Sequence, residues 1–188
     1  MPDLTPQEFA RGCLLRIVAQ PGRYNQETWQ TVAADDVDFG SRSSANVSCA
    51  TTGCVAGTVA MLAGDVGIVQ RNGKFTRGGI DFYDINTVIS ETGRRHNIRQ
   101  RGQDLLELSE RDASWLFAGT RKLPEVVNAL IELSESREIT RREVSDMTQE
   151  ERDSLMKYRV PKIVKRQNVP APQNAPQTTS VGVHHGDR

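Results

Sequence analysis

Apolar residues near the N-terminus recur at the three-to-four-residue spacing of an α-helix. The stripe begins just after a capping box, in which Thr5 can cap the helix and Glu8 can bind back to the cap. Its members are Phe9, Cys13, Leu14, Ile17 and Val18. The pattern predicts an amphipathic helix that ends at Pro21-Gly22.

The segment GCVAGTVAML, residues 53–62, carries no charged residue. Gly64 follows it and can end a helix in the left-handed conformation. A helix that is apolar on all sides has to be surrounded by other elements. We therefore expect this helix at the centre of the fold.

The only clear strand signal lies just after this helix. Residues 67–76 alternate in short segments around Asn72-Gly73, which is a strong short-range signal for a tight hairpin. The flanking patterns favour helices. A short helix is expected to carry Trp29 and Val32 inward, and an interrupted helix is expected from about residue 86 to residue 108.

Four further helix starts follow. Ser109 can cap a short helix, Leu123-Pro124 opens a clearly amphipathic helix, and Thr140 and Thr148 each begin a capping box. From residue 160 onward the chain has four prolines and no periodic apolar pattern. This last segment cannot bury enough apolar surface to offset its ordering entropy, so we expect it to be disordered.

These patterns predict a mainly α fold with one small β-hairpin (α+β). Residues 1–135 would form a compact helical domain around the buried central helix. Residues 136–159 would form a polar helical extension, and residues 160–188 a disordered, Pro-rich tail.

Composition narrows the function classes. The 188 residues include 24 basic and 24 acidic side chains, and the resulting net charge of zero excludes a generally basic protein. Three cysteines are too few for a disulfide framework, and the N-terminus lacks the pattern of a signal peptide, so we expect a cytoplasmic protein. The uncharged run at 43–64 is too polar in its first half to span a membrane.

The most specific motif is CATTGCVAG, residues 49–57. The chain resembles a group of small, mostly uncharacterised bacteriophage and actinobacterial proteins that carry Cys-x4-Cys-[Ile/Val]-Ala-Gly. Members of the group also tend to have a helix before the motif that ends near a Trp, and a leucine-rich segment after it that ends in Leu-Phe. The corresponding segments here are RIVAQPGRYNQETW and DLLELSERDASWLF, so the resemblance covers roughly residues 8 to 133. Ala50 and Thr58 depart from the pattern, since Gly and an aromatic or His are common at these positions. The resemblance implies an origin and an architecture, and no mechanism.

Four interpretations of the cysteine pair stay open. In the first, Cys49 anchors the loop while Cys54, Ala56 and Gly57 form a narrow helix face that packs closely. In the second, Cys54 is a nucleophile in the first turn of a helix, with His96 as its base. A structural zinc site would need a fourth ligand beyond the three cysteines, and a Cys49–Cys54 disulfide is disfavoured in a reducing cytoplasm. We expect neither a metal nor a cofactor.

Two clusters of basic residues are candidates for binding a partner or nucleic acid. The first cluster is Arg94, Arg95, Arg99 and Arg101, and the second is Lys157, Arg159, Lys162, Lys165 and Arg166. The first cluster precedes a helix-turn-helix pattern, but its second helix carries Glu110 and Asp112, which disfavours DNA recognition. The second cluster could bind RNA, DNA or an acidic partner protein without reading base sequence. The plainer interpretations are a solvated helix face for the first cluster and a solubilising linker for the second.

The chain has no phosphate loop, dinucleotide fingerprint or hydrolase elbow. We therefore expect a non-enzymatic accessory protein, encoded by a bacteriophage and acting in the host cytoplasm, that binds a host or phage protein through its polar helices and tail. One alternative is a cysteine-dependent hydrolase or transferase that uses Cys54. The other is a weak nucleic-acid binder that uses the basic clusters.

Overall fold

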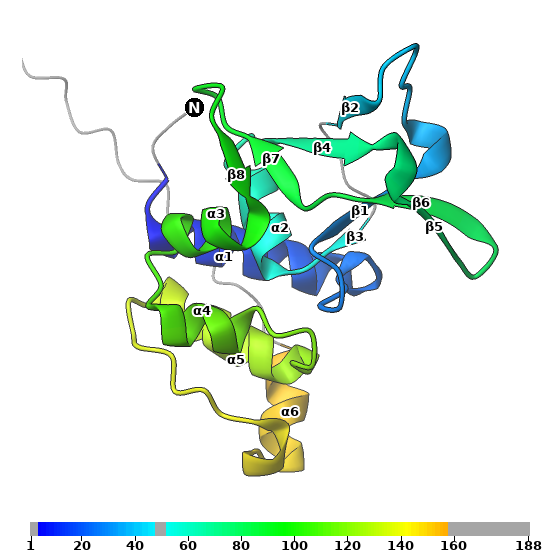
Figure 1. Ribbon diagram of the computed structural model, residues 1–188. Helices are drawn as coiled ribbons and strands as arrows, with labels where there is room; N and C mark the ends of the chain where they lie inside the picture. The colour runs from blue at the N-terminus through cyan, green and yellow to red at the C-terminus, as the bar shows by residue number, and fades with distance from the viewer. Residues whose placement is uncertain (1–3, 48–51, 158–188) are drawn as a thin grey trace, which may run out of the picture.

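The computed structural model describes residues 4–47 and 52–157, which form six α-helices and two four-stranded antiparallel sheets (Figure 1). Sheet A has the strand order β3-β1-β6-β5, and sheet B has the order β2-β4-β7-β8. The strands of sheet A are β1 (Gln30–Ala33), β3 (Thr52–Gly53), β5 (Lys74–Arg77) and β6 (Ile80–Asp84). The strands of sheet B are β2 (Ser44–Val47), β4 (Val66–Gln70), β7 (Thr87–Ile89) and β8 (Arg95–Asn97).

The prediction of a mainly α fold with one small β-hairpin is therefore wrong, and β1 shows why. Trp29 and Val32 have helical spacing, but the polar residues between them are buried as well: Gln30 and Thr31 are 2% and 4% exposed. The Gln30 amide donates to the Gly57 carbonyl oxygen, and the Thr31 and Thr52 hydroxyls lie 2.7 Å apart. These long-range hydrogen bonds allow polar side chains to be buried in the core. The order of polar and apolar residues along this segment therefore did not indicate a strand.

The predicted hairpin at Asn72-Gly73 is also wrong. These residues belong to the short 3-10 helix η3 (Arg71–Gly73), which carries the chain from β4 in sheet B to β5 in sheet A. The hairpin that does form joins β5 to β6 through Gly78-Gly79, with φ angles of +59° and +81°. A two-residue hairpin turn of this kind needs positive φ at both positions, which glycine adopts without strain.

The helix expected from residue 86 to residue 108 begins only at Ile98. Strands β7 and β8 occupy its first part, and Gly93 turns the chain between them with a φ of +78°. The remaining helical part is α3 (Ile98–Leu105), capped by Asn97.

Most of the helices that the sequence predicts from a capping residue begin where expected. Thr5 caps α1 (Pro6–Ala19), Ser109 caps α4 (Glu110–Leu116) and Thr148 caps α6 (Gln149–Met156), each by accepting a backbone N–H. The amphipathic helix α5 (Leu123–Ser134) also forms where expected. The exception is Thr140, which begins no α-helix; the chain beyond it forms only the 3-10 helix η4 (Val144–Asp146).

The uncharged segment forms the central helix α2 (Val55–Leu62), as predicted. Gly64 follows it with a φ of +77°. Four of its side chains, Val55, Ala56, Val59 and Ala60, are fully buried. Helix α2 packs against α1 and α3, while α1 packs chiefly on α5. Figure 1 shows α2 between the strands and the lower helices, and the β5–β6 hairpin projecting from the rest of the molecule.

Residues 136–157 pack against α5 through two buried carboxylates. Glu132 accepts hydrogen bonds from the backbone N–H and the hydroxyl of Thr140, at 3.0 and 2.8 Å. Glu125 accepts from the Val144 N–H at 2.9 Å. Ile139 and Met147 are 6% and 5% exposed, so the segment contributes to the buried interior. The predicted Pro-rich tail lies outside the described residues.

Candidate functional site

Cys54 lies at the N-cap of α2, inside the core. Its backbone N–H donates to the Trp29 carbonyl oxygen at 3.1 Å, and the residue is 1% exposed. Burial raises the pKa of the Cys54 thiol to about 11, and the backbone N–H groups of Gly57 and Ala56 offset only part of that effect. The group is therefore a protonated thiol at neutral pH, which makes it a poor nucleophile.

Cys13 is a second buried thiol beside the start of α2. Its Sγ atom lies 3.9 Å from the Val55 carbonyl oxygen. Burial, with a smaller contribution from nearby Cys54, raises the pKa of the Cys13 thiol far above its ordinary value. Both cysteines are free thiols. Cys49, proposed as a loop anchor or disulfide partner, lies outside the described residues.

The structure does not bring His96 to Cys54. His96 lies on β8, opposite Val88, and borders a hollow that is also lined by Leu62 and Ala63. These two residues stand at the end of α2, whereas Cys54 stands at its beginning. Eight helical residues span about 12 Å, so the imidazole and the thiol lie at opposite ends of the helix. Within residues 4–47 and 52–157, no histidine is placed to act as a base for Cys54.

Ala56 and Gly57 make close contacts on two sides of α2. A Cβ atom at Gly57 would lie 2.2 Å from the Trp29 carbonyl oxygen, closer than any side chain tolerates. A Cβ atom at Gly102 of α3 would lie 2.7 Å from the Cβ atom of Ala56. Small residues here let a strand and a helix approach α2 closely, which is what the packing interpretation of the motif requires.

The first basic cluster is divided by its ion pairs. Arg101 binds Asp65 with two hydrogen bonds, at 2.7 and 3.1 Å, and the Asp65 side chain is fully buried. Arg99 binds Glu110 and the Ser114 hydroxyl. Arg94, just before β8, and Arg95, the first residue of β8, make no ion pair with any described residue.

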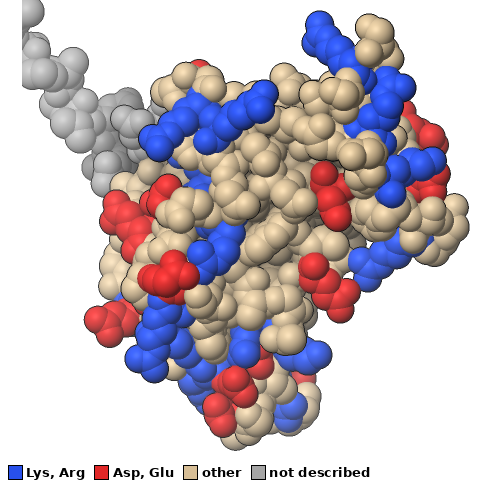
Figure 2. Space-filling view, viewed as in Figure 1, with Lys and Arg blue, Asp and Glu red and all other residues tan. Residues whose placement is uncertain are grey.

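Charge on the surface is correspondingly scattered. Figure 2 shows separate groups of basic side chains on the viewed face, with acidic side chains among them and uncharged surface between them. In the second cluster, Lys157 follows α6, and Arg159, Lys162, Lys165 and Arg166 lie outside the described residues. The described residues on the viewed face form no continuous basic stripe.

The described residues also bear on two other kinds of site, a metal centre and a membrane-spanning helix. Within 4–47 and 52–157, no group of three His, Cys, Asp or Glu side chains is placed to hold a metal ion. None of the helices in these ranges is long and apolar enough to cross a membrane.

One face of sheet A lines an open hollow on the surface of the molecule. Alternation along the strands directs five side chains to this face, and they line one side of a hollow of about 530 Å³. Phe75 and Phe82 stand opposite each other with stacked rings, 5.9 Å between centroids. The five residues are Thr31, Thr52, Phe75, Arg77 and Phe82. We call this surface the open face.

A buried hydrogen-bond chain holds the opposite wall of the hollow. The Tyr24 hydroxyl donates to the Gln26 amide oxygen at 2.6 Å, and the Gln26 amide nitrogen donates to the Leu116 carbonyl oxygen at 2.6 Å. Both ends of the Gln26 amide are thereby used, which fixes its orientation. A Cβ atom at Gly119 would be in ordinary contact with Gln26 and Glu27, so the two loops that form this wall pack directly together.

The rim of the hollow carries three basic side chains, and two of them are paired with carboxylates. Arg77, Arg121 and Lys122 line it together with Glu27. Arg77 lies 3.5 Å from Glu27, and the Arg121 guanidinium lies 3.1 Å from Glu143 and over the Trp115 ring. The hollow therefore combines stacked aromatic rings, hydroxyl groups and basic side chains, of which Lys122 has no ion pair with a described residue.

The sequence reasoning missed the open face entirely. The Gly78-Gly79 dipeptide between FTR and IDFYD was the available signal, because it favours a hairpin that places Phe75 opposite Phe82. No local pattern shows that β1 pairs with β6, which brings Thr31 and Thr52 to the same face.

Comparison of the chain with protein-family models, with curated proteins and with solved structures finds no match.

Proposed function

We propose that the protein is a non-enzymatic binding protein that holds an extended, acidic segment of a partner protein against the open face. The observation that carries this proposal is the stacked pair Phe75 and Phe82, half-buried on a sheet face that lines a hollow of about 530 Å³. Aromatic side chains of this kind contribute strongly to binding when a partner covers them.

Two further features support an extended, acidic occupant. Strand β5 is the edge of sheet A, so its outer N–H and C=O groups are free to pair with an added strand. Lys122 has no ion pair with a described residue, and Arg77 is paired only with the exposed Glu27, so both basic side chains can attract carboxylates to the same place. In this proposal the protein is encoded by a bacteriophage and acts as an accessory protein in the host cytoplasm.

The buried thiols argue against the enzymatic alternative. A cysteine enzyme needs an exposed or activated thiolate and a base, whereas Cys54 is 1% exposed with a raised pKa, and His96 lies at the other end of α2. The chemistry of the described residues therefore supports binding better than catalysis.

The test is a selection of displayed random twelve-residue peptides on the full-length protein, followed by fluorescence polarisation with the enriched sequences. We expect enriched peptides to alternate apolar and acidic residues. The double variant Phe75→Ala/Phe82→Ala, with its fold checked by circular dichroism, is expected to weaken their binding about tenfold or more.

Leu15→Ala is the matched control, because Leu15 is an exposed apolar residue, 43% exposed, on α1 and outside the hollow. It should leave peptide affinity unchanged. Enriched peptides that bind the double variant as well as the native protein would overturn the proposal, as would a selection that enriches none.

A further inference from the structure

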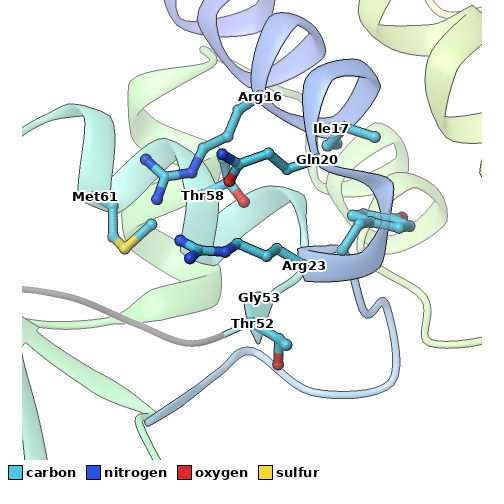
Figure 3. A pocket seen from close by; sticks show the side chains of 9 residues that line it. Arg16, Ile17, Gln20, Arg23, Thr52, Gly53, Thr58 and Met61 are labelled. Carbon is cyan, nitrogen blue, oxygen red and sulfur yellow. The ribbon is translucent and has the colours of Figure 1, made fainter. Parts of the chain in front are cut away.

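A second concave site lies beside the hollow, between the end of α1, the 3-10 helix η1 (Pro21–Arg23) and α2. Nine residues line it, and none of these is acidic. Figure 3 shows Arg16 from α1 and Arg23 from η1 extending their guanidinium groups to the same side, with Gln20 between them. Neither arginine forms an ion pair with any residue in the described ranges. Two like charges directed to one place repel each other unless an anion lies between them.

A hydroxyl group in the wall of the site points to the same ligand. Thr58 lines the site and is 6% exposed. Among the described residues, no hydrogen bond to its hydroxyl is formed. The hydroxyl therefore remains available as a hydrogen-bond donor in the wall of a site that is also lined by two arginines.

We propose that Arg16, Arg23 and Thr58 form a binding site for a phosphate group. A phosphate monoester carries nearly two negative charges at neutral pH and has three free acceptor oxygens. Two guanidinium groups supply the matching charge and several N–H donors, and the Gln20 amide adds further donors. A carboxylate brings one charge and two oxygens, and so leaves part of this donor set unused.

The dimensions of the site decide how the phosphate would lie. The part that a water-sized group can enter measures about 20 Å³, room for one such group. One phosphate oxygen would occupy this part and accept from Thr58. The remaining oxygens would stay at the open mouth, where Arg16 is half-buried and Arg23 is exposed. Ile17 and Met61 also line the site and limit its hydration.

This inference does not depend on the open face. The two sites share Tyr24 and Thr52 in their linings, but the phosphate-binding groups belong to α1, η1 and α2. Phosphate binding can therefore fail while peptides still bind the open face, and the reverse result is equally possible.

The test is a titration of the full-length protein with inorganic phosphate at constant ionic strength and pH 7.5. Binding is followed by the thermal unfolding midpoint and by the arginine side-chain N–H signals in NMR. We expect saturable binding, a raised midpoint and shifted signals of Arg16 and Arg23. Arg16→Gln and Arg23→Gln should each weaken binding about tenfold or more.

Thr58→Val separates a ligand-binding role from a structural one. Because the hydroxyl has no partner in the described part of the chain, its removal should leave the midpoint without phosphate unchanged or raised. The same variant should weaken phosphate binding about fivefold. Arg95→Gln is the matched control, an arginine on β8 without an ion pair to any described residue, and it should bind phosphate as the native chain does.

Parallel titrations with sodium acetate and with O-phosphoserine define the ligand class and its source. Acetate that binds as tightly as phosphate would overturn the proposal, and so would phosphate binding that is absent or unchanged in Arg16→Gln and Arg23→Gln. Tighter binding of phosphoserine supports the site and assigns it to a phosphorylated residue. Tighter binding of inorganic phosphate supports the site and assigns it to the free ion.

Discussion

The two buried cysteines illustrate how the environment of a residue decides its chemistry. Cys54 stands at a helix N-terminus, a position that usually stabilises a thiolate. Burial outweighs this effect, because an ionised sulfur would lose its hydration inside the core. Sequence position alone could not reveal this, since the burial comes from α1 and β1, which are distant in the chain.

Thiol labelling tests this conclusion. In a Cys49→Ser background, only Cys13 and Cys54 remain, and we expect iodoacetamide to label the native protein at pH 7.5 at least about 100-fold more slowly than the urea-unfolded chain. The reason is the raised pKa of both thiols together with their burial. Mass spectrometry of timed samples gives both rates. Rapid native labelling of Cys54 would restore the nucleophile hypothesis.

The same pKa shift makes stability depend on pH. Burial raises the pKa of Cys54 from 9.0 to about 11, so between these values the folded state keeps a proton that the unfolded chain has lost. The contribution is complete below pH 9 and is lost as the pH rises towards 11. We expect the free energy of unfolding, from urea titrations at pH 8 and 10.5, to fall less in Cys54→Ala than in the native chain. An equal fall in both proteins would contradict the shift.

At the scale of elements, helices with a local capping residue were largely predictable, whereas most strands and all strand pairings were not. Each helix with a side-chain cap from Thr5, Ser109 or Thr148 formed, because capping is local chemistry within four residues. Thr140 failed because Glu132, eight residues earlier, binds its hydroxyl and its N–H. The strands have two to five residues each, too short for a clear alternation, and their partners are set by tertiary contacts.

The candidate sites follow the same division. His96 and Cys54 were paired on residue type alone, whereas the structure places them at opposite ends of α2. The open face and the Arg16–Arg23 site each combine side chains from at least three elements. Arg16 and Thr58 are 42 positions apart, and no spacing rule connects residues so distant in the chain.

Helix α3 is fastened to the turn after α2 by the Asp65–Arg101 pair. Arg101→Met should lower the free energy of unfolding by about 3 kcal/mol, because the fully buried Asp65 carboxylate loses its charged partner. Arg99→Met is the matched control on the same helix. Its partner Glu110 has a side chain that is 69% exposed, so we expect a loss of about 0 to 1 kcal/mol.

Urea unfolding measured by circular dichroism gives both values. The double variant Asp65→Asn/Arg101→Met should recover part of the loss, since a neutral amide costs less to bury than a carboxylate. Equal losses in Arg101→Met and Arg99→Met would show that burial of Asp65 does not matter.

At the scale of the whole molecule, one hydrophobic cluster joins all the layers. It includes residues of sheet A, such as Val32 and Tyr83, residues of sheet B, such as Val69 and Val88, and residues of α1 to α5. Neither sheet has a separate core among the described residues. The two sheets and the helices are therefore expected to unfold together.

The two tryptophans report on distant parts of this cluster. Trp29 precedes β1, and Trp115 lies on α4 beside Arg121. In Trp29→Phe and in Trp115→Phe, the urea midpoint from the remaining tryptophan's fluorescence should equal the midpoint from far-UV circular dichroism of the same variant. Different midpoints within one variant would show that the helices and sheet A unfold separately.

The packing of α1 on α5 has a consequence for biosynthesis. Helix α1 leaves the ribosome before the other described elements, and its main partner, residues 123–134, is synthesised about a hundred residues later. Strand β1 likewise waits for β6, some fifty residues later. The growing chain therefore exposes the apolar stripe of α1 until nearly the whole domain has been translated, and its protection in that interval depends on chaperones or on the speed of synthesis.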